Sequence, residues 1–174
     1  QGKLVGIVTS LDLIHASPSP ATSLDMYELH YLLSKLKVEA VMTKNVITVM
    51  EDLPIEEAAR TMADNNISGL PVMRNDILVG IITESDLFKL FIELFGARHK
   101  GVRLTVLLPE RKGELADLAG AIAKIGGNII SLATFEGEDP TNSFCTIKVE
   151  SVDKTNLINA VTPLVERIVD VRES

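Results

Sequence analysis

The sequence is poor in the residues that metal, redox and disulfide chemistry require. Its 174 residues include one cysteine, Cys145, and three histidines, His15, His30 and His99, which stand far apart in the chain. One cysteine cannot form an internal disulfide, and its alternating neighbours SFCTIKV indicate a thiol packed in a strand. Isolated histidines are typical of surface or packing positions. We therefore expect no metal site and no redox chemistry, and the cysteine count fits a cytoplasmic protein.

Clusters of positive charge and long apolar runs are also missing. The 17 Lys and Arg residues against 24 Asp and Glu give a net charge of −7, with no basic run that could attract a nucleic-acid backbone. The apolar stretch LFKLFIELFGA is interrupted by Lys89 and Glu93, and no signal-peptide pattern opens the chain. Neither nucleic acid nor a membrane is an expected partner. The 46% hydrophobic content is that of a globular protein.

Common catalytic motifs are absent as well. The chain has no phosphate-binding loop of the G-x-x-x-x-G-K type, no dinucleotide-binding glycine turn and no H-E-x-x-H helix. An enzyme is therefore not expected, and no cofactor is required.

What the sequence does contain is an internal repeat. The phrase LVGIVTSLDLI at residues 4–14 returns as LVGIITESDLF at residues 78–88. Three residue types keep their places, 74 positions apart: Gly6 and Gly80, Thr9 and Thr83, Asp12 and Asp86. The counterpart of residues 38–75 is missing from the first copy, so we expect the sequence to begin within a first repeat.

Each copy ends in T-x-x-D, which has two interpretations. A threonine followed three residues later by an acidic residue is a capping box that stabilises the start of a helix. The same groups also suit a ligand, because a hydroxyl and N–H groups at a helix start can bind a phosphate and a carboxylate can accept bonds from two ribose hydroxyls. Both interpretations can hold together.

The apolar pattern predicts an α+β fold in three blocks. The first has a strand (3–8), the first turns of a helix (9–15), a Pro/Ser-rich loop and an amphipathic helix (25–36) capped by Ser23 or Asp25. The second reads β-α-β-β-α: a strand (46–49), a helix opened by Pro54, strands (67–73 and 77–82) and a helix (85–95). The third reads β-α-β-β-α-β, a ferredoxin-like order with its helices on one face. Its elements are strands 102–108, 128–136, 143–150 and 168–172, a helix from Gly113 to Ile125 and a helix over 153–166 that Pro163 kinks or ends.

The second and third blocks resemble known domains. VITVMEDLPIEEAARTMADNNISGLPVM with ILVGIITESDL resembles a CBS (cystathionine-β-synthase-type) domain, and LVGIVTSLDLI resembles the end of a preceding one, as in a Bateman module of two CBS repeats. ERKGELADLAGAIAKIGGNIISL resembles an ACT domain, with Lys112 where that family has proline. The combination is similar to acetoin-utilisation proteins of the AcuB type. It implies a first-repeat remnant (1–16), a linker and helix (17–37), a second CBS repeat (38–97) and an ACT domain (101–174).

The CBS resemblance implies a regulatory sensor and not an enzyme. Such pairs bind an adenosine-containing ligand, such as AMP, ATP or S-adenosylmethionine, in a cleft between repeats. The cleft residues that it implies here are Thr9, Asp12, Ile47, Ser68, Gly69 and Pro71, with Thr83 and Asp86 in a second half-site whose partner residues are absent. Neither T-x-x-D motif contains a basic residue and Glu84 would repel a polyphosphate, which favours AMP over ATP unless Lys44 points inward.

The ACT resemblance implies an amino acid or small metabolite at Gly113, Leu115 and Asn128. The alternative is that Gly113 serves only as a turn glycine and that Asn128 only follows a helix end. An exposed sheet edge and a shared cleft predict a homodimer or a higher homo-oligomer that acts on an unidentified regulated protein. A structural oligomerisation module without a ligand is the second hypothesis, and an enzyme is the third.

Overall fold

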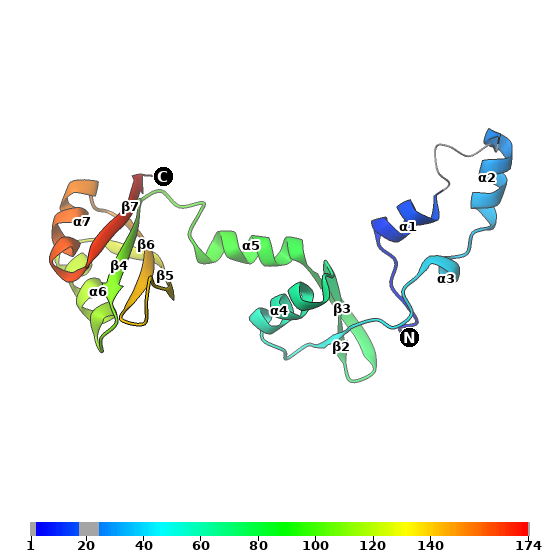
Figure 1. Cartoon of the computed structure of the whole chain (residues 1–174), viewed down its shortest axis with the longest axis horizontal. Coiled ribbons are helices and arrows are strands. Elements are labelled where there is room, and N and C mark those ends of the chain that lie inside the picture. The colour runs from blue at the N-terminus through cyan, green and yellow to red at the C-terminus, as the bar shows by residue number, and fades with distance from the viewer. Residues whose placement is uncertain (1–2, 18–24, 174) are drawn as a thin grey trace. The chain divides into compact units, whose positions relative to one another are not determined.

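The computed structural model describes residues 3–17 and 25–173, which belong to two compact units. The first unit is Gln1–Leu87 and the second is Phe88–Ser174 (Figure 1). The boundary between them falls inside helix α5 (Glu84–Leu94) and not in a loop.

Three short helices open the first unit: α1 (Ser10–Ala16), α2 (Met26–Lys35) and α3 (Val38–Val41). Thr9 caps α1 and Asp25 caps α2, each with a complete capping box. The helix predicted over 25–36 is therefore confirmed with Asp25 as its cap, whereas Ser23 lies outside the described residues.

The strand predicted over residues 3–8 is wrong where the structure describes it. Only an isolated bridge forms, in which Ile7 N–H donates to Thr43 O at 3.0 Å and Thr43 N–H donates to Ile7 O at 2.9 Å. A strand needs pairing along its length, and here the pairing stops after one residue pair. Gly6 permits the close approach, because a Cβ at this position would lie 2.5 Å from the sulfur of Met42.

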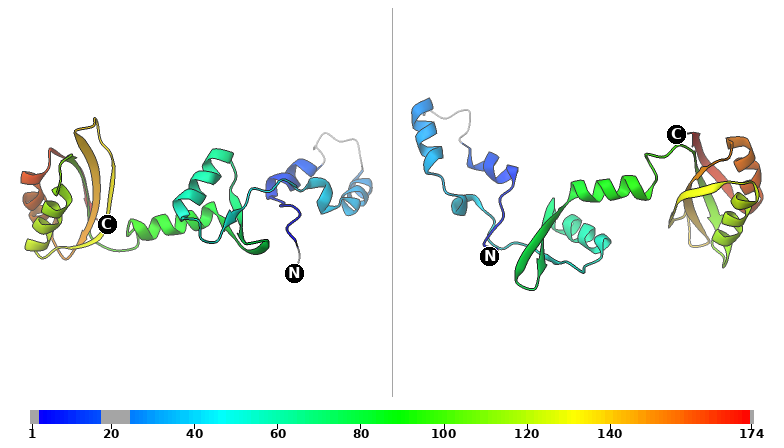
Figure 2. Two further views of the ribbon diagram at one scale, coloured as in Figure 1. Left: turned by 90° about the horizontal axis from the view of Figure 1, so that it is seen from below. Right: turned by 180° about the vertical axis from the view of Figure 1, so that it is seen from behind.

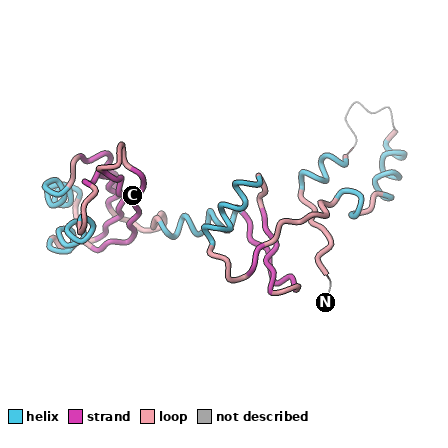
Figure 3. Tube along the Cα trace, turned by 60° about the horizontal axis from the view of Figure 1, so that its bottom comes forward, coloured by secondary structure: helices cyan, strands magenta, loops and turns pink. Residues whose placement is uncertain are grey.

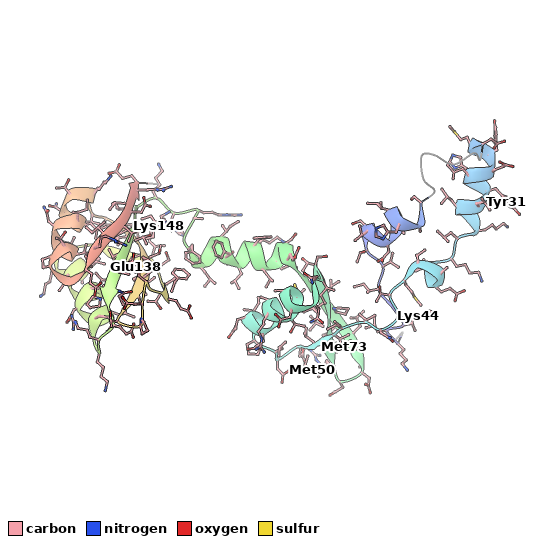
Figure 4. All side chains as sticks on the ribbon, viewed as in Figure 1. Tyr31, Lys44, Met50, Met73, Glu138 and Lys148 are labelled. Carbon is pink, nitrogen blue, oxygen red and sulfur yellow. The ribbon has the colours of Figure 1, made fainter. Side chains whose placement is uncertain are left out.

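The rest of the first unit has the predicted β-α-β-β-α order: β1 (Val49–Met50), α4 (Ile55–Asn65), β2 (Gly69–Arg74), β3 (Ile77–Thr83) and α5. Strand β2 lies between β1, to which it is parallel, and β3, to which it is antiparallel. Met50 pairs with Met73 across β1 and β2, and Figure 4 labels both on the sheet. A small core of Val49, Ala58, Met62 and Leu70 joins the sheet to α4. Strand β1 is shorter than predicted and begins three residues later.

The second unit has the β-α-β-β-α-β order: β4 (Val102–Pro109), α6 (Glu114–Lys124), β5 (Asn128–Glu136), β6 (Asn142–Glu150), α7 (Lys154–Val161) and β7 (Arg167–Glu173). Its four strands form an antiparallel sheet in the order β5-β6-β4-β7. Figures 1 and 2 show α6 and α7 side by side on one face of this sheet, and Figure 3 shows the same two layers.

The core of the second unit lies between the sheet and these two helices. Alternate residues of β4 and β6 face Leu118 and Ile122 of α6 and Leu157 and Val161 of α7, all four of them fully buried. The helix predicted over 153–166 ends at Val161, and Pro163 lies in a short 3₁₀ helix (Thr162–Leu164). Proline has no N–H to continue the α-helical bonds, so the predicted break occurs at this point.

The opposite face of the sheet is contacted by the segment between α5 and β4, residues 95–101, here called the connector. The side chain of Lys148 on β6 is almost fully buried and donates from Nζ to the backbone oxygen of Gly96 at 2.9 Å. The rings of Phe95 and Phe135 stack with their centroids 6.3 Å apart. Gly96 has φ +57°, and a Cβ there would lie 2.7 Å from Cγ2 of Ile130. Figure 4 labels Lys148 on the sheet.

Cys145 lies in the core of the second unit, as the alternating pattern predicted. Its side chain is fully buried on β6, and burial raises the pKa of the thiol to about 11. Separately, no helix in residues 3–17 and 25–173 has the length and apolar character needed to cross a membrane.

Candidate ligand-binding site

The first T-x-x-D motif forms a closed set of hydrogen bonds at the start of α1. The N–H and the hydroxyl of Thr9 both donate to Oδ2 of Asp12, at 2.8 and 2.7 Å, and the N–H of Asp12 donates to Thr9 Oγ1 at 3.4 Å. The bonds from Thr9 lower the pKa of Asp12 below its usual value of 3.8. The capping interpretation of this motif is therefore confirmed.

The second motif repeats the arrangement at the start of α5. The N–H of Thr83 donates to Oδ2 of Asp86 at 3.0 Å, and the Thr83 hydroxyl donates to the same oxygen at 2.7 Å. The internal sequence repeat thus corresponds to a repeated local structure.

One cavity of the first unit gathers most of the predicted site residues. It has a volume of about 530 Å³, within the range of small-molecule sites. Four stretches of chain line it: Ile7 to Asp12, Thr43 with Asn45 to Ile47, Asn66 to Gly69, and Ile81 with Thr83. We call it the site cavity. The predicted residues Thr9, Asp12, Ile47, Ser68 and Gly69 all lie on its wall.

Two predicted positions differ from this picture. Pro71 lies on a neighbouring apolar cavity of about 560 Å³, which shares Ile7, Val8 and Ile81 with the site cavity. Thr83, assigned to a separate half-site, lines the site cavity itself, because β3 pairs antiparallel with β2 and so places Thr83 opposite Gly69. Asp86 does not line the site cavity.

The wall of the site cavity is mostly apolar or neutral. Hydroxyl and amide groups lie among the aliphatic side chains of Ile7, Val8, Val46, Ile47 and Ile67. Among the lining residues that the structure describes, Asp12 carries the one ionisable side chain. Lys44 stands between two lining residues and is not itself on the wall.

Four polar residues on this wall were not predicted: Ser10, Thr43, Asn45 and Asn66. Asn66 had a usable sequence signal, because an asparagine after a helix pattern and before a strand is a common helix end; the structure places it at the end of α4 in the left-handed conformation, with φ 52°. Thr43 and Asn45 lie in irregular backbone and carry no comparable pattern.

The predicted ACT residues are not gathered in the same way. Gly113 caps α6 with φ +90°. Asn128 follows the far end of this 11-residue helix, which is roughly 16 Å long by helical rise, and donates to Glu150 Oε1 at 2.7 Å. Leu115 lines a cavity of about 720 Å³ beside the turn between β5 and β6. Four carboxylates also line it: Glu110, Glu114, Glu136 and Asp139. Over the part of the chain that the structure describes, no group of acidic, histidine or cysteine side chains is arranged to hold a metal ion.

Comparison with known proteins identifies the second repeat. The sequence model of the CBS domain family matches residues 38–93. The chain is 40% identical over 91 residues to L-aspartate semialdehyde sulfurtransferase of Methanocaldococcus jannaschii, a match that covers 52% of this chain and 15% of that protein. An uncharacterized protein of the same organism is 34% identical over 117 residues, which covers 52% of this chain and 68% of that protein.

Solved structures are also similar to part of the chain. A crystal structure of the CBS domain pair of protein MJ0100, in complex with 5′-methylthioadenosine and S-adenosyl-L-methionine, is 37% identical, with a TM-score of 0.41. This match covers 56% of this chain and 65% of that one. The chain thus spans less than two thirds of that pair and a small part of the sulfurtransferase. The family model thus identifies residues 38–93 of this chain as a CBS domain.

Proposed function

We propose that the chain is a regulatory protein whose first unit binds an adenosine-containing ligand in the site cavity. The observation that carries the proposal is that one cavity of the first unit joins the Thr9–Asp12 motif to Ile47 and to the Ser68–Gly69 stretch. CBS domains serve in general as regulatory modules, which favours a sensor over an enzyme.

Each part of the wall suits one part of such a ligand. Both bonds from Thr9 end on Oδ2 of Asp12, so Oδ1 is available to accept a ribose hydroxyl. Val46 and Ile47 offer apolar surface to an adenine ring. Ser68 and Asn66 offer neutral donors and acceptors to the edge of the base.

The test is calorimetric titration of adenosine compounds into the wild type and two variants. Asp12→Asn should weaken binding about tenfold or more, because a ribose hydroxyl loses its charged acceptor in a partly desolvated cavity. Asp64→Asn is the matched control, since Asp64 is exposed on α4 and does not line the cavity. If no adenosine compound binds, or if both variants bind like the wild type, the proposal is rejected.

For the second unit we propose an ACT domain over residues 101–174 that binds an amino acid or a small metabolite. The β-α-β-β-α-β order supports it, as does the cavity beside Leu115. Strands β5 and β7 are the two edges of the sheet, and an unpaired edge favours association with a second copy. We therefore propose a homodimer or a higher homo-oligomer, in the cytoplasm, with a regulatory role in acetoin utilisation. Light scattering that gives a monomeric mass at micromolar concentration would reject the assembly.

A structural module without a ligand is the second candidate, and the complete capping boxes favour it. Thr9 and Asp12 already form hydrogen bonds with one another without any ligand. In that case the titrations would show no binding, and Asp12→Asn would change only the stability of α1.

A further inference from the structure

We infer that the site cavity selects adenosine ligands without phosphate, namely nucleosides whose 5′ substituent is neutral or positively charged. The inference rests on the proposed function and specifies the ligand class of the same cavity. It goes against a nucleoside mono- or triphosphate as the preferred ligand.

The first argument is the charge of the wall. Asp12 is the one ionisable residue among the described residues that line the cavity. Thr9 lowers its pKa below the usual value, so Asp12 is a carboxylate at neutral pH. None of the described residues that line the cavity is a lysine, an arginine or a histidine. Phosphate groups in proteins are commonly bound by such cations, through charge-assisted hydrogen bonds.

The second argument is that the threonine donors at the two helix starts are already in use. A phosphate at a helix start depends on free N–H groups and a hydroxyl. Here the N–H and the hydroxyl of Thr9 both donate to Asp12, and those of Thr83 both donate to Asp86. In both motifs a carboxylate occupies the place that a phosphate would take, and it would repel one.

The third argument concerns the nearest residues outside the wall. Thr43 and Asn45 line the cavity, but Lys44 between them, which Figure 4 labels, is not among the lining residues. On the other side, Glu84 donates its N–H to the oxygen of Ser68 at 3.1 Å, which places a second acidic residue beside the cavity.

The size of the effect follows from Coulomb's law. A phosphate monoester carries about −1.5 to −2 charges at neutral pH. Placed roughly 6–8 Å from one carboxylate in a partly hydrated cavity, it loses about tenfold in affinity relative to a neutral group. The loss should shrink as salt screens the repulsion, whereas binding of a neutral nucleoside should hardly depend on salt.

The experiment is calorimetric titration of the whole chain with five compounds at low and high ionic strength. We expect 5′-methylthioadenosine, adenosine and S-adenosylmethionine to bind at least about tenfold more tightly than AMP, and ATP to bind more weakly still. High salt should narrow the gap. AMP or ATP that binds as tightly as 5′-methylthioadenosine overturns the inference and leaves the proposed function intact. If none of the five binds, the proposed function itself fails.

Two neighbouring substitutions sharpen the test. Asn45→Arg places a cation on the wall and should raise the affinity for AMP relative to 5′-methylthioadenosine by about tenfold. Lys44→Ala, one residue away and off the wall, should leave AMP binding unchanged. A loss of about tenfold for AMP in Lys44→Ala would show that Lys44 does reach the ligand, and would overturn the inference.

Discussion

Gly96 offers a direct test of how the connector is held against the sheet of the second unit. Its φ of +57° is left-handed, and a Cβ there would meet Cγ2 of Ile130 at 2.7 Å. Gly96→Ala therefore combines two costs. An alanine in the left-handed conformation costs roughly 1–2 kcal/mol of stability. The forced contact with Ile130 adds about 1–2 kcal/mol, which is near the lower end of the cost of overpacking a core, because Ile130 is half-buried and can shift. We expect a total loss of about 2–4 kcal/mol in the unfolding free energy of the second unit.

Ile130→Ala removes the atom that the new methyl group would strike, so the two costs can be separated. In the Ile130→Ala background Gly96→Ala should cost only the backbone part, about 1–2 kcal/mol. The cycle should therefore show a coupling of about 1–2 kcal/mol between the two residues. The assay is hydrogen exchange of β6 peptides, with α4 peptides as a reference in the first unit. A neutral Gly96→Ala, or additive effects in the double variant, would refute the reasoning.

Three further outcomes are expected. Cys145, with a pKa of about 11, should not react with a disulfide reagent at pH 8 until the protein unfolds, and rapid reaction of the native protein would contradict its burial. The pKa of Asp12 in the folded protein lies below 3.8, so its stabilisation of α1 is present above pH 3.8 and is lost as the pH falls through the folded pKa. Amide exchange of α1 should accelerate over this pH range in the wild type, and Asp12→Asn should abolish this pH dependence. Leu118→Ala empties a fully buried site and should cost about 2–5 kcal/mol in urea unfolding, whereas Leu132→Ala, 38% exposed, should cost clearly less; equal costs would contradict the assigned core.

Local patterns were enough to predict most of the elements. Strand β5 was predicted over the observed Asn128–Glu136, because Gly126 and Gly127 end the preceding helix and a turn-rich stretch follows. The early end of α7 at Pro163 follows from one residue. The prediction of a strand over residues 3–8 failed because strand formation depends on a pairing partner elsewhere in the chain, which a local pattern does not specify.

The candidate site was only partly predicted, because local patterns reveal single motifs but not how strands pair. The repeat pointed to Thr9 and Asp12, and the family resemblance joined them to Ser68. The pairing of β2 with β3, which sets where Thr83 and Pro71 lie, is a tertiary property. Lys148 was missed altogether, because a lysine in an alternating strand predicts an exposed side chain, and only the connector buries it.

The position of the unit boundary inside α5 limits how the protein can be divided. A fragment that ended at Leu87 would keep a single turn, Glu84 to Leu87, far below the length at which a helix is stable alone. The Thr83–Asp86 bonds would then no longer cap a stable helix, and Thr83, which lines the site cavity, would be held less firmly. A protease would likewise find no flexible stretch at this boundary. Any dissection or domain exchange therefore has to carry α5 whole with the first unit and make its cut in the connector.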